Sequence, residues 1–556
     1  MIERHFVEAS GGRVHYRRTG SGPPLVLLHG LPRASGSVAP VIDELAGVGT
    51  VIAPDLPGYG LSDPLGLEAP SIDDYAGALL STLDALGLGR VDLAGLQLGA
   101  IVALAVADRA PERIRTLTLD GLPAFDEDDR ADLTAQFTPP LTPEWDGAHL
   151  VRAWAIRRDA YVFAPWYRRS STHRAPLAFP DANALYDEVL ALLLAGPEYP
   201  RPYQAAFRYD PRPALDRLRL PTLAIDRPTD LSTRLLGASA VSIHQGPLAD
   251  AVREALDDPR AGPRPPAAPP PPARSPNAGE IVIQFGTSDA GPLLVRRAGG
   301  GEKRPLVLFH ASPGTSASLE PLLGALDRPA FAFDTPGNGE SAALTGEVTI
   351  TGIAAVAIQA LNSLGVDQFD VYGAHTGALV ALEVALQQPD RARHLVLDGV
   401  PTYSPEEAAE QLAHHAPAMP QADDGSQLVW AWHLIRDRAL WSPWHNRTPE
   451  GASMPRVRAP FPSPEVLHER VLEFLKGART YHLNYAAVFR YPTIERLKQL
   501  RQPALAVVGE GSSLREKAVA AAAAIPNGRT WLVPGMGLFG ASTAALEKLT
   551  EFLDGA

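Results

Sequence analysis

Cysteine is absent from all 556 residues of the chain. Without a thiol the chain forms no disulfide, offers no thiolate nucleophile and builds no cysteine-ligated zinc site. An excess of basic residues is also missing, because 63 acidic against 50 basic side chains leave a net charge of -13. That balance argues against a nucleic-acid partner, since such partners favour clustered basic surface.

Long apolar runs are missing as well. The two most apolar stretches, residues 93–107 and 518–525, are too short or too interrupted by glycine to span a bilayer. The first residues have neither a basic leader nor an apolar core of the secretory type. We therefore expect a cytoplasmic protein with no membrane span.

Motifs for phosphates, dinucleotides and metals are lacking too. The sequence has no Walker loop, no dinucleotide fingerprint and no His/Asp cluster with metal-ligand spacing. The hydrophobic fraction of 45% is that of an ordinary globular protein, and the length allows two or more domains. We expect no cofactor and no metal.

Proline, by contrast, is concentrated in one segment. Residues 261–278 include the run Pro269–Pro272, which neither pairs in a sheet nor continues a helix and so predicts an extended linker. This linker separates a first domain, residues 1–260, from a second, residues 279–556.

The two halves are copies of one unit, because a shift of about 280 residues aligns strands, turns and single side chains. The repeated segments pair as Leu25–Gly30 with Leu306–Ala311, Pro54–Ser62 with Phe333–Ser341, Gly95–Gly99 with Gly373–Gly377, and Leu117–Pro123 with Leu395–Pro401. Later matches include Trp154 with Trp432 and Arg158 with Arg436. We interpret the chain as an internal duplication of a whole domain.

Short β-branched runs alternate with Ala/Leu-rich segments in each half, which predicts the α/β class. Each domain should have a mostly parallel sheet with helices on both faces. In the first half we expect strands at Pro24–Leu28, Thr50–Ala53, Val91–Ala94, Ile114–Leu119 and Pro221–Ile225. Residues of about 125–210 and 403–492 intervene before the last strands and should form helical caps.

The motifs of both halves resemble those of the α/β-hydrolase superfamily, in its epoxide hydrolase and haloalkane dehalogenase branch. The turn His29-Gly-Leu-Pro32, the turn Asp55-Leu-Pro-Gly-Tyr-Gly-Leu-Ser62 and the glycine-flanked segment Gly95–Gly99 occur in the order of that family. The resemblance covers nearly the whole chain except the linker. It implies two tandem hydrolase-like domains.

The resemblance also implies a nucleophile elbow, a strained turn that lifts a Ser or Asp above the sheet. Here the elbow residue is Gln97 in the first copy and His375 in the second. A Gln amide is neither acid nor base near neutral pH, whereas a His can accept or donate a proton. We therefore consider His375 the best catalytic candidate, with Gln97 more suited to substrate binding.

The other triad positions have also changed. Asp230 could fill the place of the family's catalytic acid in the first copy, whereas the second copy has Ser512 there. At the position of the catalytic His the second copy has Leu538. Asp120 and Asp398 end the strand after the elbow helix, from which some family members supply their acid, so Asp398 could orient His375. We expect both catalytic triads to be degenerate.

Several further residues are candidates for binding. The amides after the elbow, at Leu98 and Thr376, and those at Leu31 and Ser312 could form oxyanion holes. His29 and His310 usually brace this turn in the family, so we favour a structural role for them. Seven of the eight tryptophans, Trp154 and Trp432 among them, fall in the caps, where they form the lid's apolar underside or an aromatic substrate pocket.

These features predict a cofactor-independent, non-hydrolytic enzyme that moves a proton next to a carbonyl, as an epimerase, isomerase, cyclase or lyase does. Such degenerate proteins occur in natural-product and peptide-tailoring pathways, which implies a small-molecule or peptide substrate. Two alternatives stay open: a non-catalytic ligand-binding or scaffold protein, and an unusual hydrolase of esters, amides or epoxides. A protein partner or a homo-oligomer is compatible with all three.

Overall fold

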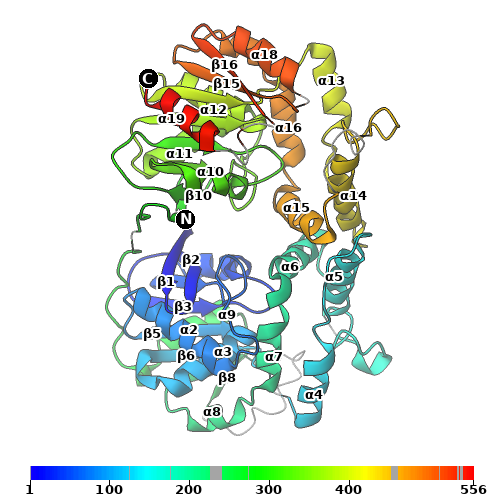
Figure 1. The fold of residues 1–556 in the computed structure, drawn as a ribbon. Coiled ribbons are helices and arrows are strands. Elements are labelled where there is room, and N and C mark those ends of the chain that lie inside the picture. Colours follow the sequence, from blue (N-terminus) through cyan, green and yellow to red (C-terminus); the bar gives the residue numbers. More distant parts are fainter. Residues whose placement is uncertain are drawn as a thin grey trace. The chain divides into compact units, whose positions relative to one another are not determined.

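The computed structural model describes residues 2–123, 125–175, 177–225, 241–272, 274–452, 461–512, 514–534, 538 and 543–555. The chain divides into two compact units, Met1–Ala273 with Gln421–Val429 and Arg274–Pro420 with Trp430–Ala556. We call them unit 1 and unit 2 and describe each by itself (Figure 1).

Unit 1 is built on an eight-stranded sheet in the order β1-β2-β4-β3-β5-β6-β7-β8. The strands β1 and β2 pair antiparallel, β2 pairs antiparallel with β4, and the remaining neighbours are parallel. Their bounds are β1 Glu3–Ala9, β2 Gly12–Thr19, β3 Pro24–Leu28, β4 Thr50–Pro54, β5 Val91–Leu96, β6 Ile114–Asp120, β7 Thr222–Ile225 and β8 Ser242–His244. The predicted α/β class is confirmed.

Helices cover both faces of this sheet, as a parallel sheet requires. Helices α1 (Ala39–Glu44) and α9 (Leu248–Leu256) pack on one face, over side chains of β3 and β4. Helices α2 (Ile72–Ala85) and α3 (Leu98–Arg109) pack together on the other, and ten consecutive residues from Leu98 to Ala107 are buried. A helix that is apolar all round belongs in the centre of a domain, and α3 is the helix that follows the elbow.

The segment between β6 and β7 forms a helical cap. Its helices are α4 (Glu127–Gln136), α5 (Ala148–Asp159), α6 (Ala182–Leu194) and α7 (Pro200–Arg208), and α8 (Arg212–Arg217) leads back to the sheet. Asp126 and Asp181 cap the amino ends of α4 and α6 by accepting a backbone N–H three residues on, which satisfies one of the unpaired donors of each first turn.

Unit 2 repeats this architecture strand for strand. Its sheet has the order β9-β10-β12-β11-β13-β14-β15-β16. The bounds are β9 Ile281–Gly286, β10 Leu293–Ala298, β11 Leu306–Phe309, β12 Ala330–Phe333, β13 Phe369–Ala374, β14 Ala392–Asp398, β15 Ala504–Gly509 and β16 Gly528–Val533. Because the strand order matches that of unit 1, the sequence repeat corresponds to a repeat of the fold.

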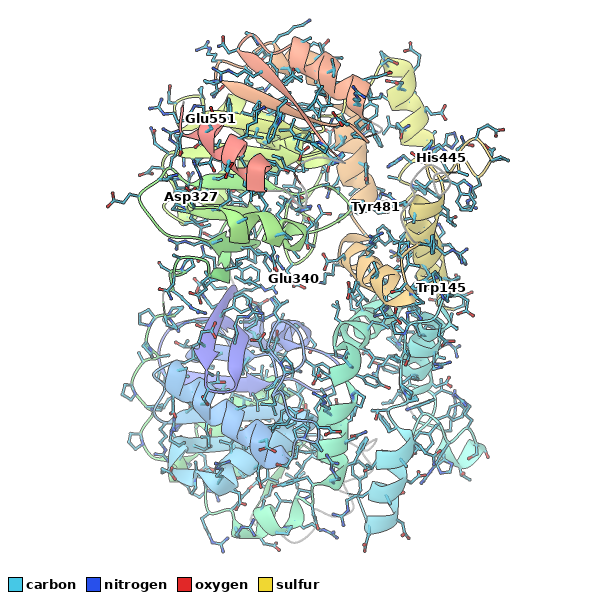
Figure 2. The ribbon with its side chains drawn as sticks, viewed as in Figure 1. Trp145, Asp327, Glu340, His445, Tyr481 and Glu551 are labelled. Carbon is cyan, nitrogen blue, oxygen red and sulfur yellow. The ribbon has the colours of Figure 1, made fainter. Side chains whose placement is uncertain are left out.

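The helices of unit 2 also correspond to those of unit 1. Helices α10 (Glu320–Ala325) and α19 (Thr543–Leu553) cover one face of the sheet, while α11 (Ile350–Ser363) and α12 (Thr376–Gln387) cover the other. The cap comprises α13 (Pro405–His414), α14 (Ser426–Leu440), α15 (Pro464–Gly477) and α16 (Tyr481–Arg490), and α17 (Thr493–Leu497) and α18 (Arg515–Ala523) flank β15. Tyr481, labelled in Figure 2, is buried at the start of α16, and its hydroxyl donates to the carbonyl of Pro417.

Residues 262–272 of the proline-rich segment form no helix or strand and contact unit 1. Ala268 N donates to Gly22 O over 2.9 Å, and Arg18 Nη1 donates to Pro269 O over 2.6 Å. Proline offers a carbonyl but no N–H, so an arginine donor from β2 holds this segment. No helix in the described part of the chain is long and apolar enough to cross a membrane.

Candidate functional site: two elbows of equal shape

The elbow of unit 1 is the turn between β5 and α3. Gln97 has φ 49° and ψ −112°, a conformation that side-chain-bearing residues rarely adopt. A Cβ on Gly99 would lie 2.7 Å from the carbonyl oxygens of Leu28 and His29. Only a glycine at position 99 allows α3 to begin this close to the end of β3. This close packing requires the sharp turn at Gln97.

The elbow of unit 2 has the same backbone. His375 also has φ 49° and ψ −112°, and a Cβ on Gly377 would lie 2.5 Å from the carbonyl oxygen of His310. Gln97 and His375 are the two non-glycine residues with positive φ among the described residues. Both copies therefore retain the strained turn although neither has a serine or aspartate in it.

The two elbow side chains point to different neighbours. In unit 1 the Gln97 side chain lies over Gly30, in the turn after β3. A Cβ atom built on Gly30 would lie 3.2 Å from Cδ of Gln97. In unit 2 the His375 imidazole lies over Gly399, just after the end of β14. A Cβ atom built on Gly399 would lie 3.2 Å from Cε1 of His375. Burial lowers the pKa of His375, and the imidazole is therefore a neutral base at neutral pH.

The predicted oxyanion amides differ between the units. In unit 1 neither Leu31 N nor Leu98 N donates to another described residue, and Leu98 is the first residue of α3, where an N–H has no intrahelical acceptor. In unit 2 the amide of Ser312 donates to Oγ1 of Thr376 over 2.7 Å. The Thr376 hydroxyl thus accepts the hydrogen bond of the Ser312 amide, whereas the equivalent amide in unit 1, Leu31 N, donates to no described residue.

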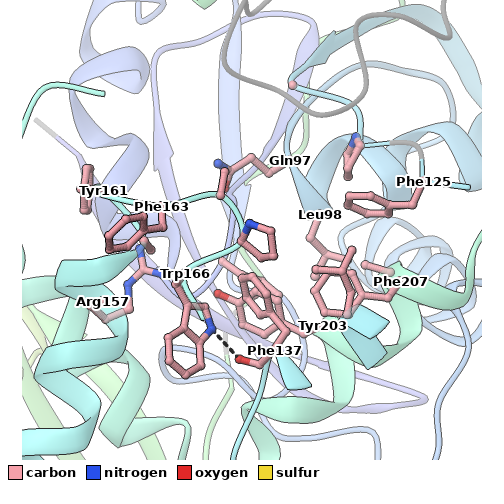
Figure 3. A pocket seen from close by; sticks show the side chains of 18 of the residues that line it. Gln97, Leu98, Phe125, Phe137, Arg157, Tyr161, Phe163, Trp166, Tyr203 and Phe207 are labelled. Carbon is pink, nitrogen blue, oxygen red and sulfur yellow. Dashed lines mark hydrogen bonds between the residues drawn. The ribbon is translucent and has the colours of Figure 1, made fainter. Parts of the chain in front are cut away.

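A cavity of about 410 Å³ lies between the elbow of unit 1 and its cap. Gln97 and Leu98 line it from the elbow, and α7 and the segments after α4 and α5 supply an aromatic wall (Figure 3). The wall includes Phe137, Trp166, Tyr203 and Phe207. Trp166 is fixed by a hydrogen bond of 2.9 Å from its Nε1 to Phe137 O. This volume accommodates a ligand of about two aromatic rings.

The two tryptophans predicted from the repeat have another place. Trp154 and Trp432 are buried in α5 and α14, and Trp154 is not among the residues that line the cavity of unit 1. The sequence missed Arg157 and Tyr203, which do line it. Arg157 lies one helical turn after Trp154. The second copy has Ile435 at the equivalent position, and this difference between the copies could have identified Arg157 as a candidate.

The aspartates at the strand ends are joined to the elbows through the backbone. Gln97 N donates to Asp120 O over 2.8 Å, and His375 N donates to Asp398 O over 2.7 Å. The Asp398 side chain is 1% exposed; Oδ2 accepts from Tyr372 Oη (2.8 Å) and Leu538 N (2.7 Å). Burial raises the pKa of Asp398 to about 6.

The backbone amide of Leu538 therefore contacts the Asp398 carboxylate. That Leu538 replaces the family's catalytic His stays a prediction. Oδ1 of Asp398 accepts no hydrogen bond from a described residue. That Asp398 orients the imidazole of His375 stays a prediction, as do the roles of Asp120 and Asp230. Asp230 itself lies outside the described residues.

His29 and His310 brace the turns after β3 and β11. His29 Nε2 accepts from Leu56 N over 2.9 Å, and His310 Nε2 accepts from Thr335 N over 3.1 Å. Their Nδ1 atoms lie 3.1 and 2.9 Å from the carbonyl oxygens of Gly30 and Ala311. Burial lowers the pKa of both, so each is a neutral imidazole that donates through Nδ1 and accepts through Nε2.

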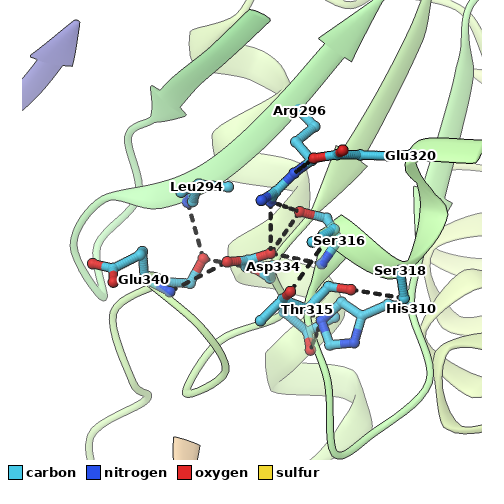
Figure 4. A network of polar contacts seen from close by, with 12 residues as sticks. Leu294, Arg296, His310, Thr315, Ser316, Ser318, Glu320, Asp334 and Glu340 are labelled. Carbon is cyan, nitrogen blue, oxygen red and sulfur yellow. Dashed lines mark hydrogen bonds and ion pairs between the residues drawn. The ribbon is translucent and has the colours of Figure 1, made fainter. Parts of the chain in front are cut away.

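A buried carboxylate supports each of these turns. In unit 2, Oδ1 of Asp334 accepts from Ser316 N (2.7 Å) and Ser316 Oγ (2.5 Å), and Oδ2 accepts from Glu340 N (3.2 Å) (Figure 4). Asp55 does the same in unit 1 with Ser35 N and Leu61 N. These residues hold the loops that carry Leu31 and Ser312.

Two parallel-sheet units with capped, glycine-flanked elbows define the class of protein. A family model described as the alpha/beta hydrolase fold matches residues 23–211 and 304–430. These matches cover more than half of the chain, and the chain belongs to this family.

Curated relatives match shorter stretches. The chain is 42% identical over 114 residues to a 2-hydroxy-6-oxononadienedioate/2-hydroxy-6-oxononatrienedioate hydrolase of Burkholderia vietnamiensis, which is 20% of this chain and 40% of that protein. It is 36% identical over 151 residues to epoxide hydrolase 3 of Siraitia grosvenorii, 26% of this chain and 44% of that protein. The chain thus spans about two fifths of the length of these relatives.

One solved structure similar to this chain is epoxide hydrolase A from Mycobacterium thermoresistibile. Its TM-score is 0.40 at 20% identity, and the match covers 50% of this chain and 99% of that one.

Proposed function

We propose that the chain is a cofactor-independent, non-hydrolytic enzyme in which His375 moves a proton on the carbon next to a carbonyl group. The observation that supports this most is the neutral imidazole held on a strained elbow. Strain of this kind persists where the surrounding structure and the site maintain it. A neutral His at that point can accept a proton from carbon, and a positioned base of this type contributes about 10²–10⁴-fold in rate.

The donors for the developing enolate would come from the first turn of α12. Thr376 N has no intrahelical acceptor, and the Thr376 hydroxyl, which accepts from Ser312 N, donates to no described residue. Both can therefore donate to an oxygen near His375. The absence of a serine or aspartate at either elbow supports a non-hydrolytic reaction, because the usual acyl or alkyl intermediate has no atom on which to form.

The test uses 2-tetralone, an aromatic ketone with readily exchanged α protons, in D₂O at pH 7.5. Proton NMR should show exchange accelerated by the wild type and reduced by about 10²-fold or more in His375→Gln, which copies the elbow of unit 1. The exposed histidine of α13 gives the control, His414→Ala, with unchanged exchange. Equal rates for wild type and His375→Gln, or His375-dependent release of p-nitrophenol from p-nitrophenyl butyrate, would contradict the proposal.

A second function, ligand binding without chemistry, is favoured for unit 1. At one end its cavity has the side-chain amide of Gln97 and the backbone amides of Leu31 and Leu98, which donate to no described residue. These groups suit a carbonyl oxygen. None of them titrates near neutral pH. Unit 1 would then bind a carbonyl compound, while unit 2 carries the reaction. Gln97→Ala should weaken binding of 2-tetralone to unit 1 in calorimetry, and unchanged affinity would contradict this role.

A further inference from the structure

A cluster of charged side chains forms one wall of the cavity in unit 1. Arg33, Arg157 and Tyr161 line the cavity, and all three contact the carboxylate of Glu188 from α6. Arg157 donates to Oε2 of Glu188 from Nη2 (2.6 Å) and Nε (3.2 Å), and Tyr161 Oη donates to Oε1 over 2.5 Å. The Glu188 side chain is 5% exposed and is not among the lining residues.

This cluster carries a net charge of +1. Burial alone would raise the pKa of Glu188, but Arg157, Arg33 and the Tyr161 hydroxyl more than offset it and hold that pKa below its usual value. Glu188 is therefore ionised at neutral pH and balances one of the two guanidinium groups. Among the described residues, those that line the cavity include both arginines and no acidic side chain. Nη1 of Arg157 donates to no described residue.

The cluster is not a requirement of the fold, because the second copy lacks it. By the register of the repeat, Gly314 stands in the place of Arg33, Ile435 in that of Arg157, and Ala439 in that of Tyr161. Unit 2 nevertheless has the same strand order and the same elbow conformation. The additional positive charge lies at the wall of the cavity, where Arg157 is paired with Glu188 and the Arg33 side chain is 46% exposed. A cavity with apolar walls and an excess of one charge favours a ligand of the opposite charge, so this charge favours an anion.

We propose that the cavity of unit 1 binds an aromatic or apolar ligand that carries one carboxylate, which pairs with Arg157 and Arg33. One negative charge neutralises the cluster, and the planar guanidinium suits a carboxylate in a two-point contact. The aromatic wall receives the ligand body, and the elbow amides receive its carbonyl oxygen. This inference rests on the proposed ligand-binding role of unit 1 and adds the chemical class of the ligand.

The test compares two isosteric probes, biphenyl-4-carboxylate and biphenyl-4-carboxamide, by calorimetry with the full chain at pH 7.5. Wild type should bind the carboxylate at least about tenfold more tightly than the amide, the usual gain from a charged hydrogen-bonded pair. Arg157→Leu should abolish this preference, and Arg157→Lys should restore part of it. Arg158→Leu is the matched control, because the Arg158 guanidinium lies over the Phe179 ring and does not line the cavity.

A second variant, Arg33→Leu, keeps the test informative if Arg157→Leu does not fold. The Arg33 side chain is 46% exposed, and its removal brings the charge of the cluster to zero while the Arg157–Glu188 pair remains, so the preference should fall at least about threefold. Equal affinity of wild type for both probes would overturn the anionic class and leave the ligand site standing. Binding of neither probe would overturn the ligand site as well. A preference unchanged in both Arg33→Leu and Arg157→Leu would overturn the assignment to this cluster.

Discussion

The elbow of unit 1 borders a cavity with two amides that donate to no other described residue, whereas in unit 2 one of the equivalent amides donates to the Thr376 hydroxyl. The two elbow residues, Gln97 and His375, have the same φ and ψ. The difference arises from a single side chain, Leu98 in one copy and Thr376 in the other, because only a hydroxyl can accept from the facing amide.

The directions of the two elbow side chains also depend on single neighbouring residues. Gln97 lies over Gly30, where the absence of a Cβ leaves room for it, and the second copy has Ala311 at that position. His375 lies instead over Gly399. Duplication thus preserved the strained scaffold, and neighbouring residues gave each copy its own polar groups. Three predictions test this contrast.

The largest effect should come from the feature that the units share. Gly99→Ala and Gly377→Ala each place a Cβ 2.4–2.7 Å from backbone oxygens at the end of the neighbouring strand, so each should lower the free energy of unfolding of its unit by more than about 3 kcal/mol. Urea denaturation measures this. Gly324→Ala is the control, since it lies in α10 with open space around it and should stabilise by about 0.5–1 kcal/mol. A loss in one elbow only would show that the copies are not equivalent.

A smaller effect concerns Asp398. Its pKa is raised from 3.8 to about 6, so the folded state retains this proton to higher pH than the unfolded chain. The favourable contribution is complete below about pH 4 and is lost as the pH rises through 6, about 2–3 kcal/mol in all. Asp398→Asn should remove this pH dependence from urea unfolding measured between pH 4 and 7. The exposed Asp367→Asn serves as control, and an equal pH dependence in wild type and Asp398→Asn would refute the prediction.

The smallest effect comes from exchanging the residue after the elbow. In Leu98→Thr the new hydroxyl should accept from the Leu31 amide, as the Thr376 hydroxyl accepts from the Ser312 amide. Binding of a carbonyl ligand to unit 1 should then weaken by about 1 kcal/mol, which is a factor of about five in affinity. Thr376→Val should free the Ser312 amide in unit 2. Calorimetry with 2-tetralone measures the first change, and Leu98→Val gives the matched shape without the hydroxyl. Equal affinities of the Thr and Val variants would show that the open amide is not used.

Much of the fold was predictable because it depends on local pattern. The expected strand at Pro24–Leu28 is β3 as written, and the one at Thr50–Ala53 differs from β4 by one residue. The antiparallel strands β1 and β2 were not predicted, since mixed polar and apolar residues there cover an edge of the sheet and give a weak signal. Both elbow residues were identified from their flanking glycines.

The sequence by itself determined the family, the duplication and the identity of Gln97 and His375, because these depend on short segments whose glycines and prolines restrict the backbone locally. Only the tertiary structure decided that Thr376 occupies the Ser312 amide and that Arg157 faces the cavity. Those contacts join residues far apart in the chain, and their geometry follows from how the cap and sheet pack. No pattern along the sequence encodes that packing residue by residue.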